Sequence, residues 1–150
     1  MIRATSKRLF AIVVFIGLGL FGSNPAFAGP GCNLVCEGNY TIDDIDTADD
    51  LDALSRCKSI IGNLSISSTL LTSLEGLECL THIGGYLRIS DNDSLTSLAG
   101  LENLKTVAAN LVIVRNHELC TSFAEALRDR VIDAGGIGAP VYISGNKPGC

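Results

Sequence analysis

The six cysteines are the residues of this 150-residue chain with the most specific chemistry. They could hold zinc or form disulfides. Structural zinc sites use closely spaced Cys-x2-Cys and His pairs, whereas this sequence has no Cys-x2-Cys pair and no histidine near Cys32 and Cys36. An even number of cysteines is typical of disulfides in an exported protein. We therefore expect up to three disulfides, formed by Cys32, Cys36, Cys57, Cys79, Cys120 and Cys150.

No set of residues predicts catalysis. His82 and His117 fall in predicted turns, and neither has both an acidic partner and a nucleophile at a comparable position, as a Ser-His-Asp site requires. The outward strand positions offer Asp43 and Arg88 on non-adjacent repeats, which do not form an acid–base pair. We expect no enzymatic activity, no cofactor and no metal.

An acidic run precedes and enters the first predicted helix, and it invites comparison with a calcium-binding loop. That loop needs an oxygen ligand where Ala48 stands and a glycine after it, and this run has neither. Carboxylates at a helix N-terminus are favoured by the helix dipole. We therefore expect a solvated turn over Asp43, Asp44, Asp46, Asp49, Asp50 and Asp52.

The first 28 residues have the pattern of a secretory signal peptide, with three basic residues, the apolar run Leu9–Phe21 and the cleavage triplet Ala26-Phe27-Ala28. The apolar run of about 13 residues is shorter than the ~20 that span a bilayer, so a retained anchor is the less favoured interpretation. We expect cleavage after Ala28, a single domain over 29–150, and a secreted, periplasmic or cell-surface location.

The charge of the processed chain limits its partners. Residues 29–150 hold eight basic and 16 acidic residues, a net charge of −8. Nucleic acids and anionic lipids bind basic surfaces, so neither is an expected partner. The processed chain also has no second apolar run long enough to cross a membrane.

A repeat organises the rest of the chain. Leu71–Leu80 and Leu95–Leu104 are nearly identical and lie 24 residues apart, and each precedes an Ile/Val-Gly/Ala-x-x-Leu-x-Ile segment. A period of this length indicates a solenoid whose coils bury their apolar sides against each other. We predict a mainly β, right-handed solenoid of five short coils, with strands centred on Thr41, Ser65, Arg88, Val112 and Tyr142.

An asparagine follows the inward isoleucine of three strands by three residues, at Asn92, Asn116 and Asn146, and Thr69 takes this place in an earlier copy. Asparagine also favours turns for its own local reasons. The repeated register favours an inward ladder that satisfies backbone groups of adjacent coils.

Two helices are expected to close the solenoid. Thr47 is predicted to cap a helix over Ala48–Ser55. Ser122 and Glu125 form a predicted capping box for a second helix, which Gly135 and Gly136 end. Its apolar stripe is predicted to be Phe123, Leu127 and Val131.

The repeat register also favours particular cysteine pairs among the 15 possible. Cys57 aligns with inward leucines at the edge of the first coil, next to Cys36 before the first strand. Cys120 and Cys150 follow similar turns. These two pairs leave Cys32 with Cys79 by elimination.

The stretch Val35-Cys36-Glu37-Gly38 and the Cys-x-x-Ile-x-Gly-x-Leu-x-Ile string that begins at Cys57 resemble the receptor L domain, a module of insulin and epidermal growth factor receptor ectodomains. The resemblance covers about Cys32 to Cys150. It implies a single-stranded right-handed β-helix closed by a helix and a disulfide at each end, with Cys36 paired to Cys57, and a ligand-binding surface along the sheet. The sequence has one such domain, without a cysteine-rich neighbour or a kinase, so receptor signalling is not implied. With a bacterial-looking signal, it resembles a free-standing secreted relative.

The outward side of the strands is the candidate binding face. A regular ligand such as ice or crystalline polysaccharide favours one small hydroxyl residue on every coil, and Arg88, Val112 and Tyr142 interrupt such a row. A mixed face suits a protein or glycan. The alternatives are that the valines are ordinary strand formers and that the protein is a structural envelope or matrix component without a specific ligand. The candidate residues are Ser65, Ser67, Tyr86, Arg88, Val112, Val114 and Tyr142.

Asn39, Asn63 and Asn92 each begin an Asn-x-Ser/Thr triplet. In a eukaryotic host, glycans on the first two could cover the sheet face. Because the signal looks bacterial, we interpret the triplets as coincidence.

Overall fold

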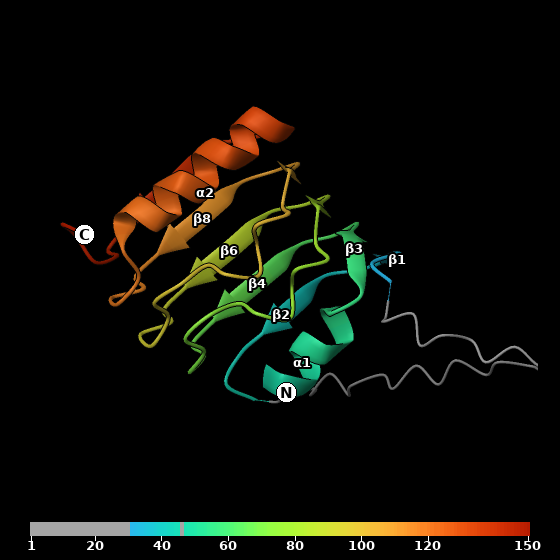
Figure 1. Ribbon diagram of the computed structural model, residues 1–150, viewed down its shortest axis with the longest axis horizontal. Helices are drawn as coiled ribbons and strands as arrows, with labels where there is room; N and C mark the ends of the chain where they lie inside the picture. The colour runs from blue at the N-terminus through green and yellow to red at the C-terminus, as the bar shows by residue number, and fades with distance from the viewer. Residues whose placement is uncertain (1–30, 46) are drawn as a thin grey trace, which may run out of the picture.

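The computed structural model describes residues 31–45 and 47–150. The predicted signal peptide and its cleavage site lie outside the described residues. Within them, the chain forms a solenoid of parallel strands with one helix toward each end (Figure 1). The predicted fold class, a mainly β solenoid, is confirmed.

Two five-stranded parallel sheets form two sides of the solenoid. We call them the major sheet, in the order β2-β4-β6-β8-β10, and the minor sheet, in the order β1-β3-β5-β7-β9. The major strands are β2 (Tyr40–Ile42), β4 (Leu64–Ser67), β6 (Leu87–Ser90), β8 (Leu111–Val114) and β10 (Val141–Ser144). The minor strands are β1 (Leu34–Cys36), β3 (Cys57–Ile60), β5 (His82–Ile83), β7 (Thr106–Val107) and β9 (Gly136–Ile137).

The register of the major sheet follows the repeat. Each strand alternates inward apolar and outward residues, as the two-residue period of a strand requires. The five predicted strand centres form one continuous outward row, in which Thr41, Ser65, Arg88, Val112 and Tyr142 pair in that order. The sequence analysis did not separate the minor sheet from the major one.

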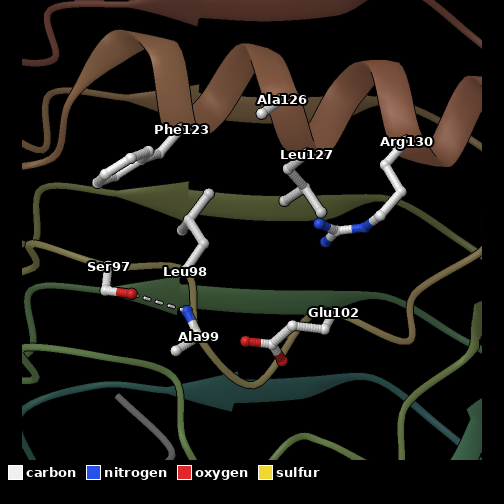
Figure 2. A pocket seen from close by; sticks show the side chains of 8 residues that line it. All are labelled: Ser97, Leu98, Ala99, Glu102, Phe123, Ala126, Leu127 and Arg130. Atoms are coloured by element: carbon white, nitrogen blue, oxygen red, sulfur yellow. Dashed lines mark hydrogen bonds between the residues drawn. The ribbon is translucent and has the colours of Figure 1, made fainter. Parts of the chain in front are cut away.

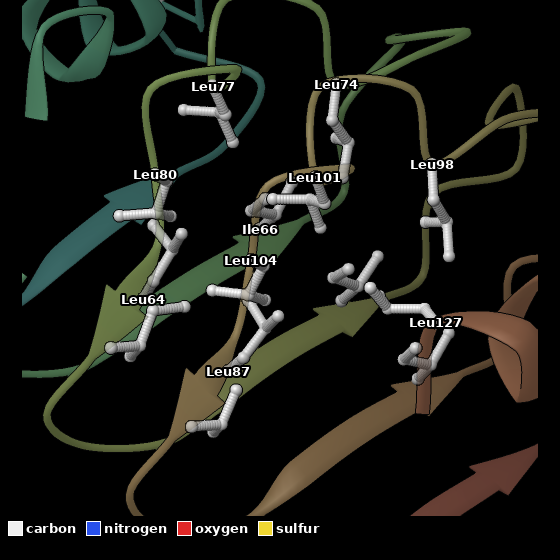
Figure 3. Close-up of a cluster of buried hydrophobic side chains, with 14 of the residues drawn as sticks. Leu64, Ile66, Leu74, Leu77, Leu80, Leu87, Leu98, Leu101, Leu104 and Leu127 are labelled. Carbon is white, nitrogen blue, oxygen red and sulfur yellow. The ribbon is translucent and has the colours of Figure 1, made fainter. Parts of the chain in front are cut away.

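The inward residues form a single core. Figure 3 shows leucines from the irregular side of the coils meeting strand residues, with Leu127 joining them from the second helix. Each repeat alone exposes these side chains to water, so their burial requires stacked coils. At most 1% of each of the following side chains is exposed: Leu64, Ile66, Leu74, Leu77, Leu80, Leu87, Ile89, Leu101, Leu104, Leu111 and Ile113.

The predicted asparagine ladder is present and buried. The Oδ1 atoms of Asn92, Asn116 and Asn146 accept backbone N–H groups of Thr69, Asn92 and Asn116 at 2.9, 3.1 and 3.1 Å. Each Nδ2 group donates to the carbonyl of an inward isoleucine one coil earlier. One side chain per coil therefore satisfies buried groups that the turns leave unpaired.

Helix α1 (Thr47–Leu54) lies at the β2 end of the major sheet. Leu54 is buried and Leu51 packs against the core, as predicted. The predicted capping role of Thr47 is wrong. Thr47 is the first helical residue, and its hydroxyl donates to the Asp43 carbonyl instead of accepting a helix N–H.

Helix α2 (Thr121–Ala134) lies along the solenoid beyond β8 (Figure 1) and ends at Gly135, as predicted. The predicted capping box is wrong, because Cys120 takes the N-cap position and the helix begins two residues earlier than expected. Ser122 Oγ donates to the Cys150 carbonyl at 2.8 Å instead. The predicted stripe is partly wrong. Phe123 is 49% exposed, and Ala124 takes its place beside Leu127 and Val131.

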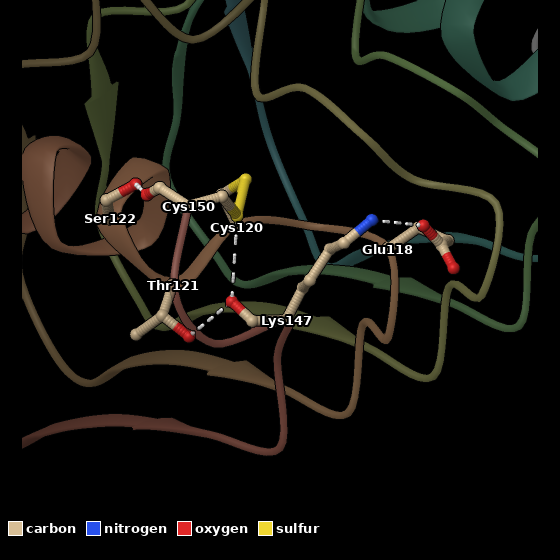
Figure 4. Close-up of a disulfide and its surroundings, with 6 residues drawn as sticks. All are labelled: Glu118, Cys120, Thr121, Ser122, Lys147 and Cys150. Carbon is tan, nitrogen blue, oxygen red and sulfur yellow. Dashed lines mark hydrogen bonds and ion pairs between the residues drawn. A yellow bond between two sulfur atoms is a disulfide. The ribbon is translucent and has the colours of Figure 1, made fainter.

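All three predicted disulfides are present: Cys32–Cys79, Cys36–Cys57 and Cys120–Cys150. They close loops of 47, 21 and 30 residues, and the chain-entropy estimate gives about 3–4 kcal/mol for each. Figure 4 shows the last of them joining the start of α2 to the final residue, beside the Lys147–Glu118 ion pair of 2.9 Å.

Within residues 31–45 and 47–150, no helix has the length and apolar character needed to cross a bilayer.

Candidate functional site

The outward row of the major sheet presents the predicted binding residues in order along the solenoid. Arg88 is exposed, and Tyr86 and Tyr142 are 37% and 53% exposed. Ser65, Ser67 and Val112 are half-buried. Val114 is only 9% exposed, because it lies between Ser90 and Ser144 in the interior of the sheet. It therefore has little surface with which to contact a ligand.

A hollow of about 280 Å³ opens on this face between β6 and β8. The structure brings together three predicted residues, Tyr86, Arg88 and Val112, around it. Asn110 completes the lining and was missed by the sequence analysis. Its signal is its repeat position, because it immediately precedes the leucine that begins a major strand, as Asn63 does.

Arg88 is the cation of this hollow. Its Nε donates to Ser90 Oγ on the same strand at 3.0 Å. Within the part of the chain that the structure describes, no carboxylate oxygen lies within ion-pair distance of its guanidinium. Its remaining N–H donors are therefore free to meet a ligand.

Arg115, at the end of β8, is engaged instead. Its guanidinium donates to both carboxylate oxygens of Asp91 at 2.6 and 2.8 Å. This hydrogen bond lowers the pKa of Asp91 below its ordinary value and raises the pKa of Arg115. The pair holds together turns of two adjacent coils and leaves Arg88 as the open cation of the hollow.

The family model for the receptor L domain matches residues 31–132, more than half of the chain. The chain belongs to the receptor L domain family. No curated protein matches it in a comparison of sequences. Receptor L domains are extracellular, non-enzymatic ligand-binding modules of receptors, and the three disulfides of this L domain suit an oxidising compartment. The match ends inside α2, so β9 and β10 lie beyond it.

The histidines of this L domain differ from the sequence-based description. His82 lies in β5 rather than in a turn, and its Nδ1 is 2.7 Å from Thr81 Oγ1. His117 does have an acidic partner, because its Nδ1 is 2.6 Å from Asp93 Oδ1 on the adjacent coil. Both side chains of this pair are largely exposed, and no nucleophilic side chain bonds to it among the described residues.

The acidic run forms a local turn where the structure describes it. Asp43 Oδ1 accepts the backbone N–H of Ile45 at 2.9 Å, which is the bond expected when an aspartate stabilises a turn. Asp46 lies outside the described residues.

A second hollow, of about 200 Å³, lies between α2 and the loop of residues 97–102 (Figure 2). Phe123, Leu127 and Arg130 project into it from the helix. Arg130 Nη2 donates to the Leu101 carbonyl at 2.7 Å and Glu102 accepts the Gly100 N–H at 2.8 Å. The lining of this hollow holds both a cation and a carboxylate, whereas the lining of the β6–β8 hollow holds a cation and no carboxylate and belongs to the predicted binding face. The β6–β8 hollow is therefore the stronger candidate for the predicted site.

At two of the three glycosylation triplets, Asn63 and Asn92, the carboxamide nitrogen that would carry a glycan donates a hydrogen bond within the fold. Asn92 is fully buried in the ladder. Asn63 Nδ2 donates to Asn39 Oδ1 at 2.8 Å, and Asn63 Oδ1 accepts the Tyr86 N–H at 2.9 Å. These contacts disfavour attachment of glycans at Asn63 and Asn92.

Replacing Arg115 with glutamine is expected to raise the pKa of the Asp91 carboxyl toward its ordinary value. A carboxyl whose folded pKa is depressed stabilises the fold above its unfolded pKa, and that contribution is lost as pH falls through the folded pKa. The variant should therefore lose less stability than the wild type as the pH falls from about 5 to about 2, the range around and below the ordinary carboxyl pKa of about 4.

The measurement is a carbon-detected NMR titration of the Asp91 carboxyl. Arg128→Gln, which removes the separate Arg128–Asp129 ion pair of 2.8 Å, is the matched control and should leave the Asp91 titration unchanged. An Asp91 carboxyl that titrates identically in Arg115→Gln and the wild type contradicts the assignment.

Proposed function

We propose that this chain is exported, that cleavage after Ala28 releases residues 29–150, and that the product is a free-standing recognition module. It acts without catalysis and binds a protein or a glycan through the exposed face of the major sheet. The observation that carries this proposal is the β6–β8 hollow, where Arg88, which forms no ion pair with a described residue, lines the same space as Tyr86.

The rigidity of the sheet supports a binding role. Arg88 is fixed between neighbouring parallel strands. The Tyr86 backbone donates to Asn63 Oδ1 and accepts the Leu64 N–H. The inward side of β6 is packed into the core through Leu87 and Ile89. A preorganised surface loses little conformational entropy when it binds a partner. A stacked solenoid offers such a surface over several coils.

The proposed residues suit recognition. Tyrosine and arginine are enriched at the energetic centres of interfaces, and Tyr86, Arg88 and Tyr142 are the exposed members of the predicted face with such side chains. Ser65, Ser67 and the half-buried Val112 supply the surrounding contact surface.

Binding of the processed protein to an array of neutral and acidic glycans, and to a displayed peptide library, tests the proposal. The face variants are Arg88→Glu and Tyr142→Ala. Lys58→Glu is the matched control, because Lys58 is an exposed cation on β3 of the minor sheet. We expect a ligand that wild type and Lys58→Glu retain equally and that each face variant binds at least about tenfold more weakly, a loss of about 1.4 kcal/mol.

Circular dichroism should show the same folded spectrum for all four proteins. A ligand that all four bind with the same affinity would place binding elsewhere on the molecule. A wild-type protein that retains nothing from either library contradicts a recognition role and favours a structural one.

A further inference from the structure

We propose that the β6–β8 hollow binds a single carboxylated sugar ring, a uronate residue of an acidic polysaccharide. This inference rests on the proposed function and names the ligand class for the same face. Three features of the hollow support it: a free amide at Asn110, an open cation at Arg88 and a small apolar surface made by Tyr86 and Val112.

The free amide of Asn110 results from a break in a second, exposed ladder. The residue that immediately precedes each major strand lies beside its counterparts in the neighbouring coils. The ladder begins at this position with Asn39, whose Oδ1 accepts the Asn63 N–H at 2.9 Å. Asn63 Oδ1 in turn accepts the Tyr86 N–H at 2.9 Å. In each case the carboxamide oxygen of one coil binds the backbone N–H of the next.

Tyr86 has no carboxamide, so the ladder stops there, and Pro140 prevents Asn110 from resuming it. Val141 pairs with Leu111, so Pro140 stands where the next coil would offer its N–H to Asn110. Proline has no backbone N–H, and the Asn110 carboxamide makes no hydrogen bond to any other described residue. Asn110 therefore lines the hollow with an unused donor and an unused acceptor, the pair of functions that a sugar hydroxyl satisfies.

Arg88 selects for a carboxylate. A guanidinium presents paired N–H donors that match the two oxygens of a carboxylate, and Arg88 has only its Nε engaged, by Ser90 Oγ. Asp91, which follows Ser90 in the chain, is held by Arg115 at 2.6 Å. The single open cation of the hollow matches one carboxylate on one sugar ring.

The size and walls of the hollow suit a ring. About 280 Å³ is slightly below the roughly 300–1,000 Å³ of sites for larger ligands. Tyr86 offers an aromatic surface and Val112 an aliphatic one, against which the C–H face of a sugar can pack. Tyr142 lies beside Val112 on the next strand and is 53% exposed, so it extends the surface for a neighbouring ring.

The same residues depart from the repeat. Two positions of each coil line the hollow, namely the residue before the major strand and the outward residue at the strand centre. The first two coils carry asparagine at the first position and Thr41 or Ser65 at the second. The third and fourth coils replace these with Tyr86, Arg88 and Val112. Stacking requires only that outward residues fit a strand, so these outward changes serve the surface rather than the core.

Calorimetric titration with a hexamer of galacturonic acid tests the inference. The fully methyl-esterified hexamer is the matched ligand, because it keeps the rings and removes the charge. We expect esterification and Arg88→Gln each to weaken binding more than tenfold, and Asn110→Ala to weaken it three- to tenfold. Lys58→Gln, an exposed cation on the minor sheet, should stay within twofold of the wild type.

Equal binding of the acidic and esterified hexamers, or full affinity in Arg88→Gln, overturns the inference. A glutamate hexapeptide that binds when the uronate hexamer does not would also overturn it, in favour of a peptide carboxylate.

The proposed function is judged separately. If the uronate does not bind but Arg88→Glu and Tyr142→Ala abolish binding of another ligand, only the present inference fails. If no ligand depends on the face, both fail.

Discussion

Replacing Asn116 with alanine is expected to lower the free energy of unfolding by about 3–5 kcal/mol, since each buried polar group left unpaired costs about 1–3 kcal/mol. Asn116 Oδ1 accepts the backbone N–H and the Nδ2 group of Asn92, both at 3.1 Å. Its own Nδ2 donates to the Ile89 carbonyl at 3.1 Å. Alanine removes all of these bonds at a fully buried position.

Asn103→Ala is the matched control for this substitution. Asn103 also bridges two coils, because its Nδ2 donates to the Glu78 carbonyl at 2.7 Å, but it is exposed to solvent. Water can replace that bond, so its loss should cost less than about 1 kcal/mol. Urea unfolding with intact disulfides measures both variants. Equal costs for the two substitutions would contradict a ladder that stabilises the stack by satisfying buried groups.

Replacing Gly100 with alanine is expected to destabilise the fold by roughly 2–5 kcal/mol, the sum of a left-handed backbone penalty of about 1–2 and an overpacking cost of about 1–3. Gly100 has φ +105°. A Cβ atom at this position would lie 1.9 Å from the Leu74 carbonyl oxygen of the neighbouring coil. Backbone atoms cannot move aside without separating the coils.

Gly76 provides a control one repeat earlier. Its φ is +108°, and its N–H donates to Glu78 Oε1 at 2.8 Å, as the N–H of Gly100 donates to Glu102 Oε2 at 2.8 Å. A Cβ at Gly76 would meet only the Leu51 side chain, at 3.8 Å. Gly76→Ala should therefore cost only the backbone penalty of about 1–2 kcal/mol. Thermal unfolding compares the two, and equal losses would contradict close coil stacking as the cause.

The repeat made the solenoid, its register and its core predictable. In a parallel stack, residues one period apart become neighbours, so a period of 23 or 24 residues places Ser65, Arg88 and Val112 side by side without further information. The same argument predicted the buried asparagine ladder. It also favoured the Cys36–Cys57 and Cys120–Cys150 pairs, whereas Cys32–Cys79 followed only by elimination.

The ends of the elements were not predictable by the same argument. The roles of Thr47 and Ser122 depend on contacts with Asp43 and Cys150, which compete with the expected capping bonds. Phe123 is exposed because α2 packs on the core through Ala124, Leu127 and Val131, a face that helical spacing alone does not distinguish from the predicted stripe. The His117–Asp93 pair depends on side-chain reach across adjacent turns.

The candidate site was predictable in part. Arg88, Tyr86 and Val112 stand out because they interrupt a row of small polar residues. Asn110 does not stand out as a residue type, and its free amide depends on Pro140, which is 30 residues away and has no N–H to donate. The burial of Val114 reflects its neighbours in the sheet, which alternation alone does not reveal.

The most direct test of a ligand site on the major sheet is an NMR titration that follows side-chain N–H signals as the galacturonate hexamer is added. The predicted result is a saturable shift of the Arg88 Nε–H and Asn110 Nδ2 signals, with the Arg130 Nε–H signal in the α2 hollow unchanged. Shifts confined to Arg130 and its neighbours, or no saturable shift at Arg88 and Asn110, would contradict the account.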